Sequence, residues 1–142
     1  MNDFAFRMLN RFHRALLAVS GGRIGSRVGS MPVVELHTVG RTTGIRRRTV
    51  LTAPLHDEGR YVLVASKGGD RRHPSWYLNL TAQPEVELTV GGRTIPMRAR
   101  TATSQERADL WPRITREYQG YAGYQRRTTR EIPVVICDPR SP

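Results

Sequence analysis

The chain has 142 residues, of which 38% are hydrophobic, and it carries a formal net charge of +11. This length fits one globular domain, and no apolar run approaches the roughly 20 residues that a membrane-spanning helix needs. The single cysteine, Cys137, excludes an internal disulfide and a cysteine-based metal site, so the sequence predicts a cytoplasmic protein in which Cys137 is a small buried residue.

The positive charge predicts an anionic partner, which can be nucleic acid, an anionic membrane or a phosphorylated small molecule. Nucleic acid is not expected, because the arginines are scattered and no nucleic-acid-binding motif is present.

Residues 3–19 show a helical pattern. Apolar side chains repeat at helical spacing at Phe4, Met8, Phe12, Leu16 and Val19, and arginines gather on another sector. We expect the apolar side to pack on the protein, with contact to an anionic membrane surface as the alternative. Glycines and serines then predict a flexible link. The chain therefore divides into residues 1–30, an amphipathic helix with its linker, and residues 31–142, which form the barrel domain that is expected to bind the ligand.

From residue 31 onward the pattern is that of strands. We expect strands at 32–39, 46–55, 60–65, 85–90, 93–100 and 132–137, and helices at 75–81, 104–111 and 112–119. The last two helices are separated at Pro112, and Thr103 with Glu106 predicts a capping box before the first of them. Because neighbouring strands can pair antiparallel and no strand–helix–strand alternation occurs, the fold class is mainly β (α+β): a small barrel of about six antiparallel strands with peripheral helices.

The turn Gly40–Gly44 is the first stretch that suggests chemistry. Its glycines are expected to expose backbone N–H groups, and Thr42, Thr43 and the flanking arginines add donors, so the turn predicts an anion nest. The alternative is a plain hairpin turn with solvated arginines.

The loop from Ala65 to Asn79 holds the one lysine of a chain otherwise rich in arginine. A lysine offers a compact point charge where arginine offers a planar fork, so Lys67 and Gly68 are candidates to meet the polar atoms of a ring. Trp76 is a candidate wall for that ring. Chance placement of Lys67 and plain core packing of Trp76 are the alternatives.

Tyr118, Tyr121 and Tyr124 recur at intervals of three. They share one face if the segment is helical, but the interleaved glycines favour a mobile loop. A tyrosine hydroxyl can donate a hydrogen bond or a proton to a substrate oxygen, and a partly exposed aromatic patch is the alternative. No catalytic triad, carboxylate pair or metal-ligand spacing is evident, so no metal is expected.

Taken in order, these motifs resemble the deazaflavin-dependent nitroreductase family. The resemblance rests on G-R-T-T-G-x-x-R, A-S-K-G-G, P-S-W-Y-L-N-L-T-A-Q-P, W-P before the tyrosines, and I-P-V-V-I-C-D-P, within residues 31–139. It implies a split β-barrel related to flavin-reductase and pyridoxamine-phosphate-oxidase-like domains. It also implies an enzyme that passes a hydride from the reduced deazaflavin coenzyme F-420 to a quinone or nitroaromatic acceptor.

The same resemblance implies roles for individual residues. The cofactor phosphate and tail would contact Arg41, Thr42, Thr43 and Arg47, and the ring would be lined by Val50, Leu51, Ala65, Ser66, Lys67, Gly68 and Trp76. The acceptor would be bound by Ser66, Trp76, Tyr118, Tyr121 and Tyr124, with Tyr121 as the catalytic candidate. The family commonly has Lys or Arg where this chain has Thr42, and Arg46 is a neighbouring cation that can compensate.

The alternatives on the same barrel are an FMN-dependent oxidoreductase and a non-catalytic carrier of the deazaflavin. Split barrels often dimerise, so a homodimer is possible, and the family's N-terminal helix is associated with proximity to the inner face of the membrane.

Overall fold

A computed structural model describes residues 27–28 and 31–140 and arranges them around one antiparallel sheet. Its strands are β1 (Arg27–Val28), β2 (Met31–Val39), β3 (Arg46–Thr52), β4 (Leu55–Asp57), β5 (Arg60–Val64), β6 (Glu85–Val90), β7 (Arg93–Thr101) and β8 (Val134–Pro139). The helices are the 3-10 helix η2 (Lys67–Gly69) and the α-helices α2 (Ser75–Ala82), α3 (Ser104–Glu117) and α4 (Gly120–Arg126). The mainly β fold class is confirmed, with eight strands in this part of the chain instead of about six.

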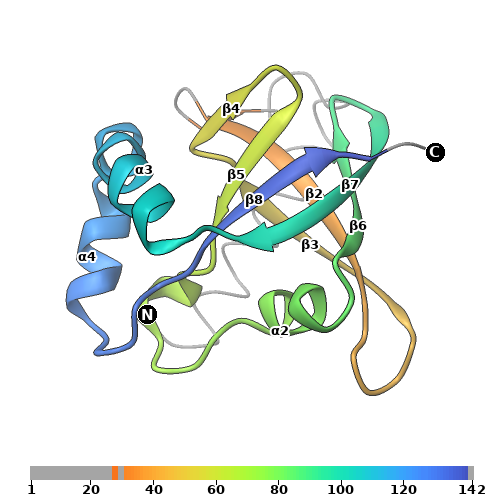
Figure 1. Cartoon of the computed structure of the whole chain (residues 1–142), viewed down its shortest axis with the longest axis horizontal. Helices are drawn as coiled ribbons and strands as arrows, with labels where there is room; N and C mark the ends of the chain where they lie inside the picture. The colour runs from red at the N-terminus through yellow and green to blue at the C-terminus, as the bar shows by residue number, and fades with distance from the viewer. Residues whose placement is uncertain (1–26, 29–30, 141–142) are drawn as a thin grey trace.

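The strands curl so that β5, β8 and β7 lie in front of β2 and β3, with the helices outside them (Figure 1). The sheet order is β1-β2-β6-β7-β8-β5-β4, and β3 pairs with β2 outside this path. Strand β8 therefore joins β7 to β5, although β5 is far from it in sequence. The helix expected at 3–19 lies outside the described residues, and Arg27–Val28 of the expected linker pair with β2.

The strand expected at 46–55 was wrong in its extent, because β3 ends at Thr52 and a separate strand β4 begins at Leu55. Pro54 lies between them and has no backbone N–H to donate to a ladder, which explains the break. After it, β4 and β5 form their own hairpin through Glu58 and Gly59, which both have positive φ.

The main hydrophobic core fills the space between the sheet and α2. Trp76 and Leu80 of α2 pack with buried strand residues that include Leu36, Leu63 and Cys137. Cys137 is fully buried, and burial raises the pKa of its thiol to about 12. The prediction that Cys137 is a buried small residue is therefore confirmed.

Helices α3 and α4 lie together at one side of the sheet (Figure 1) and cover a second core. Ile114 and Tyr121 are buried there with Val62, Val64 and other residues. The expectation of two helices divided at Pro112 was wrong, because α3 runs through this residue. The carbonyl left without a Pro112 N–H belongs to Ala108, which is exposed, so water can reach it. None of the helices in the described ranges is long and apolar enough to cross a membrane.

The start of α3 gives a prediction about pH. Glu106 accepts hydrogen bonds from both terminal nitrogens of Arg100, at 2.7 and 2.9 Å, and from Thr103 N at 2.9 Å. The Arg100 bonds, with that of Thr103, lower the pKa of Glu106 from 4.5 to about 2. The stabilisation is thus complete above pH 4.5 and is lost as the pH falls toward 2. We expect Glu106→Gln to lower Tm at neutral pH and to flatten Tm against pH in that window, as measured by thermal denaturation.

Glu131→Gln is the control for this experiment, because it removes an exposed carboxylate without touching the helix cap. A Glu106→Gln protein whose Tm falls with acid as steeply as that of the wild type would contradict the assignment.

Candidate functional site

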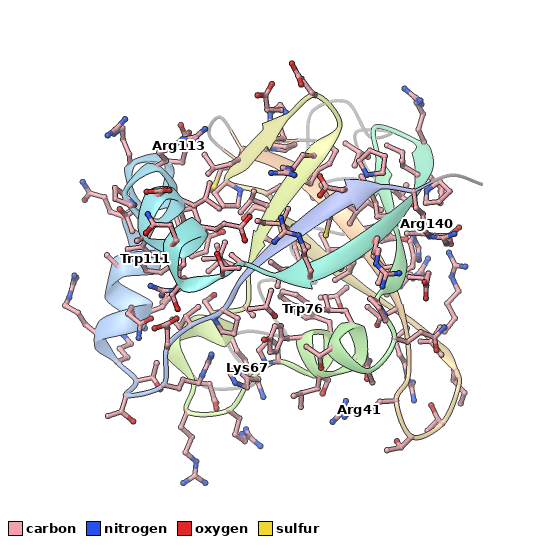
Figure 2. All side chains as sticks on the ribbon, in the orientation of Figure 1. Arg41, Lys67, Trp76, Trp111, Arg113 and Arg140 are labelled. Carbon is pink, nitrogen blue, oxygen red and sulfur yellow. The ribbon has the colours of Figure 1, made fainter. Side chains whose placement is uncertain are left out.

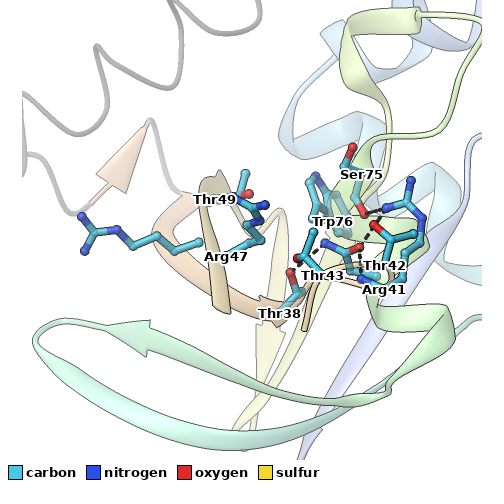
Figure 3. A pocket seen from close by; sticks show the side chains of 11 residues that line it. Thr38, Arg41, Thr42, Thr43, Arg47, Thr49, Ser75 and Trp76 are labelled. Carbon is cyan, nitrogen blue, oxygen red and sulfur yellow. Dashed lines mark hydrogen bonds between the residues drawn. The ribbon is translucent and has the colours of Figure 1, made fainter. Parts of the chain in front are cut away.

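A basic pocket of about 440 Å³ opens where the β2–β3 turn meets α2. Figure 3 shows the side chains that line it, from both elements. The lining residues are Thr38, Gly40, Arg41, Thr42, Thr43, Arg47, Arg48, Thr49, Ser75, Trp76 and Asn79. Three arginines and several hydroxyl groups thus face a volume typical of a small-molecule site. No carboxylate belongs to this lining, so the described surface of the pocket is chemically suited to an anion.

Asn79 joins the turn to α2. Its Oδ1 accepts hydrogen bonds from Arg41 N at 3.1 Å and Arg41 Nη1 at 2.8 Å, and its Nδ2 donates to Thr38 Oγ1 at 3.3 Å. Arg41 Nη1 also approaches Ser75 O at 3.5 Å, and Figure 3 draws these bonds as dashed lines. Asn79 is 4% exposed, so it lies on the buried side of α2, where these hydrogen bonds fix its side chain. Sequence reasoning gave Asn79 no role, although an amide on the buried side of a helix, three residues after Trp76, was a usable signal.

The expectation that the Gly40–Gly44 turn exposes its backbone N–H groups was wrong for most of them. Gly40 N donates to Ile45 O and Gly44 N to Gly40 O, both at 2.8 Å, while Ile45 N donates to Thr43 Oγ1 at 3.2 Å. Arg41 N is taken by Asn79. The hairpin uses these donors to close itself, so the side chains supply the attraction for an anion.

Two neighbouring arginines of β3 differ in their relation to the pocket. Arg46 forms an ion pair with Glu87 of β6, across β2, and it is absent from the pocket lining. Arg48, one of the arginines of 41–48 expected to meet the phosphate and tail, lines the pocket beside Arg47 and also approaches Glu35 at 3.7 Å.

Trp76 combines both of its expected uses. It is 4% exposed and packs in the main core, and it also lines the pocket. Figure 2 places it between α2 and the sheet. Its Nε1 is buried and has no hydrogen-bond partner among the described residues. Such a donor is normally satisfied, so it fits a bound group that offers an acceptor atom.

The loop after β5 has an unusual backbone. Lys67, Gly68 and Gly69 all have positive φ, at 45°, 64° and 85°. A left-handed lysine stores strain, which points to a functional constraint on this loop. Ala65, Ser66 and Gly68 are buried, and Arg130 bonds the carbonyls of Ala65 and Ser66.

The tyrosine segment is helical, so the mobile-loop interpretation was wrong. Tyr121 and Tyr124 lie in α4, and Tyr118 ends α3. Their rings meet edge to face, with centroids 5.1 to 6.3 Å apart. A Cβ at Gly120 would lie 2.3 Å from the Tyr118 ring, so a glycine is needed for this ring to fold back.

Tyr121 is held from the sheet. It is 6% exposed, and its hydroxyl lies 3.0 Å from Thr52 Oγ1. Burial raises the pKa of Tyr121 to about 12. Tyr118, in contrast, is exposed, and burial raises the pKa of Tyr124.

Strand β3 connects the pocket to the tyrosines. Arg47 and Thr49 line the pocket and Thr52 meets Tyr121, while Val50 and Leu51 lie between. At about 3.3 Å per strand residue, Thr49 and Thr52 are separated by roughly 10 Å. The structure brings the predicted site residues together in two groups. The pocket contains Arg41, Thr42, Thr43, Arg47 and Trp76, and the three tyrosines form one cluster. The remaining predicted residues belong to neither group: Val50, Leu51, Ala65, Ser66, Lys67 and Gly68.

Across the described residues, no three His, Cys, Asp or Glu side chains are placed to hold a metal ion.

Solved structures share this fold. A structure described as a domain-swapped dimer is 36% identical, has a TM-score of 0.70 and covers 90% of this chain and 96% of its own. A Clostridium acetobutylicum protein of the pyridoxinephosphate oxidase family is 12% identical, with a TM-score of 0.52, and covers 89% of this chain and 84% of its own. The latter likeness concerns the fold alone, and it confirms the expected split-barrel class.

Sequence comparisons agree on one family. A family model described as F-420H(2)-dependent quinone reductase matches residues 9–139. An F-420H(2)-dependent quinone reductase of Mycobacterium tuberculosis is 41% identical over 136 residues, which are 93% of this chain and 91% of the relative. A solved F-420-H2 dependent reductase is 40% identical, has a TM-score of 0.68 and covers 75% of this chain and 94% of its own. The resemblance to deazaflavin-dependent reductases is confirmed, and the chain belongs to the F-420H(2)-dependent quinone reductase family.

Proposed function

We propose that this protein reduces a quinone or nitroaromatic acceptor with a hydride from reduced coenzyme F-420, the electron donor of its family. The observation that carries the proposal is the placement of two chemically different sites along β3. An arginine-lined pocket without carboxylates lies at Arg47–Thr49, and a cluster of tyrosines meets the strand at Thr52. One site suits an anionic phosphate and tail, and the other suits a flat oxygen-bearing acceptor.

The residues present fit the cofactor. Arg41, Arg47 and Arg48, with Thr42 and Thr43, offer charged and hydroxyl donors for its phosphate and tail. This chain has Thr42 where the family commonly has Lys or Arg, and Arg48 supplies a cation in the same pocket. Trp76, whose buried Nε1 has no hydrogen-bond partner among the described residues, also lines this pocket. When bound, the reduced deazaflavin supplies the hydride, and the protein supplies position and electrostatics.

Tyr121 is proposed to hold the acceptor oxygen. Its raised pKa keeps the phenol protonated at neutral pH, so it acts as a hydrogen-bond donor. If Thr52 donates to the Tyr121 oxygen, the phenolic proton is directed away from Thr52 and toward the acceptor. Reduction of a quinone needs a proton as well as a hydride, and Tyr121 or water gives it.

The direct test is a binding titration followed by a turnover assay. F-420 fluorescence is titrated with the protein, and FMN is titrated in parallel. Oxidation of reduced F-420 is then followed with menadione and with a nitroaromatic acceptor. Binding of F-420 with menadione turnover supports the proposal. Absence of both would overturn it, preferential FMN binding would favour a flavin enzyme, and binding without turnover would favour a carrier.

Three finer expectations belong to the same proposal. A homodimer is supported by the relative that is described as a domain-swapped dimer. Contact of residues 3–19 with the inner face of the membrane is supported by their basic amphipathic pattern, and it would bring a cytoplasmic enzyme close to lipid-soluble quinones. Reduction of nitroaromatics rests on the chemistry of hydride acceptors alone.

A further inference from the structure

Arg130, in the segment before β8, forms hydrogen bonds with the loop after β5. Arg130 Nε donates to Asp70 O at 2.9 Å, Nη1 donates to Ala65 O at 3.2 Å, and Nη2 donates to Ser66 O at 2.8 Å. Nη1 also lies 3.0 Å from His73 Nδ1. One side chain thus binds three carbonyls of residues 65–70 and the ring nitrogen of His73.

Only an arginine can make this set of contacts. The guanidinium carries five N–H donors in a fixed planar fork, whereas a lysine ammonium is a single point with three donors. The three carbonyls belong to residues at both ends of the segment 65–70, so a rigid fork fixes the separation between these two ends. Arg130 is half-buried, which limits the water that would compete for these bonds.

The backbone of Arg130 is held by the tyrosine helix. Gln125 of α4 donates from Nε2 to Arg130 O at 2.7 Å. The Oε1 of Gln125 accepts from Ile132 N at 2.9 Å and from Arg107 Nη2 of α3 at 3.0 Å. Arg130 therefore sits between the loop on one side and the α3–α4 pair on the other.

The loop and α4 also touch directly. An ideal Cβ built on Gly69 would lie 2.7 Å from Tyr124 O and 3.0 Å from Arg127 Cβ. The backbones approach so closely that no side chain fits between them. A shift of the loop must consequently move against Tyr124, which belongs to the tyrosine cluster.

We propose that Arg130 is a positioning residue that locks residues 65–70 and helix α4 into one unit, so that the loop expected to line the cofactor ring and the tyrosines proposed to bind the acceptor keep a fixed relation. The inference rests on the proposed function for the identity of the two ligands. The mechanical part, the locking of loop to helix, depends only on the contacts above. Loss of Arg130 should weaken cofactor binding and acceptor binding together, although Arg130 belongs to neither the pocket lining nor the tyrosine cluster.

The test compares Arg130→Met with Arg130→Lys and with the control Arg126→Met. Arg126 is an exposed arginine of α4, so its replacement removes the same charge without touching the loop. The first readout is hydrogen–deuterium exchange of the cofactor-free proteins. Arg130→Met should speed exchange in 66–70 and 120–126 by about tenfold or more, with β2, β6 and β7 unchanged. The control should match the wild type.

The second readout is ligand binding. Arg130→Met should raise the Kd for F-420 and the KM for menadione by about tenfold to a hundredfold each, with a smaller change in kcat. Arg130→Lys should recover only part of either effect, because it restores the charge but not the fork. Full recovery by lysine would overturn the positioning role in favour of charge alone.

The outcomes separate the inference from the proposed function. Unchanged exchange in 66–70 and 120–126 overturns the inference even if F-420 binds. Faster exchange in both segments supports it even if the wild-type protein fails to bind F-420, in which case the proposed function falls. If Arg130→Met does not fold, the exchange of Arg130→Lys decides the matter in the same way.

Discussion

Replacing Gly69 with alanine is expected to lower the free energy of unfolding by about 3 kcal/mol. Gly69 has a φ of +85°, and an added Cβ would meet Tyr124 O at 2.7 Å and Tyr124 Cα at 3.1 Å. These neighbours are backbone atoms, so no side-chain rotation can relieve the contact. Either the loop moves off α4 or the helix shifts, and the second core loses packing around Tyr121. Chemical denaturation measures the loss, and an F-420 titration measures its effect on the site.

Gly92→Ala is a matched control for this prediction. Gly92 has a φ of +82°, almost that of Gly69, but nothing lies within 4 Å of its ideal Cβ. Its replacement should cost about 1 kcal/mol from backbone strain alone. The difference between the two variants isolates the close approach of loop and helix. Equal losses in both variants would mean that this approach is not tight in solution.

Replacing Asn79 with alanine is expected to lower the free energy of unfolding by about 2–3 kcal/mol and to weaken F-420 binding by at least about tenfold. Alanine removes the acceptor of two Arg41 bonds and the donor to Thr38, and Thr38 is itself buried. Arg41 then loses its fixed position at the pocket. Denaturation and fluorescence titration measure the two effects.

Asn79→Asp separates structure from charge at this position. The aspartate keeps an acceptor for Arg41 and can accept from the Thr38 hydroxyl, so stability should stay near that of the wild type. Affinity for the anionic cofactor should still fall, because a negative charge now faces a lining that had no carboxylate. Wild-type affinity in Asn79→Ala would show that Asn79 does not organise the basic pocket for F-420. Wild-type affinity in Asn79→Asp would show that a negative charge at this position does not affect F-420 binding.

Local features of the fold were predictable from the sequence. The Gly91–Gly92 turn has positive φ at both residues, as a tight hairpin requires. The capping box of Thr103 and Glu106 is present in full. Both depend on interactions between residues a few positions apart, which a sequence displays directly. The prediction of two helices divided at Pro112 failed, because packing of Ile114 in the second core outweighs a local helix-breaking preference.

Features of the site that depend on distant residues were not predictable in this way. Asn79 donates a hydrogen bond to Thr38, 41 residues away in sequence, and Arg130 donates one to Ala65, 65 residues away. A composition with many arginines gives no sign of which one is turned inward. The turn at Gly40 was misread for a related reason, since its donors are used by Ile45 and Asn79 and so depend on how the hairpin closes. The ordered motifs identified the family, but only coordinates could assign these partners.

The central position of β8 has a consequence for how the chain reaches its native state. The β2–β3, β4–β5 and β6–β7 hairpins join neighbours in sequence and can form early. The edges of β5 and β7 that face β8 stay unpaired until β8 is in place. The hydrogen bond between Arg60 of β5 and Asp138 of β8 likewise joins residues 78 positions apart in sequence. Such non-local closure is slow relative to hairpin formation, and it leaves two strand edges open to other chains during synthesis. The loop at residues 65–70 follows β5, and helix α4 precedes β8, so the pairing of β8 with β5 is the step that brings the two segments together.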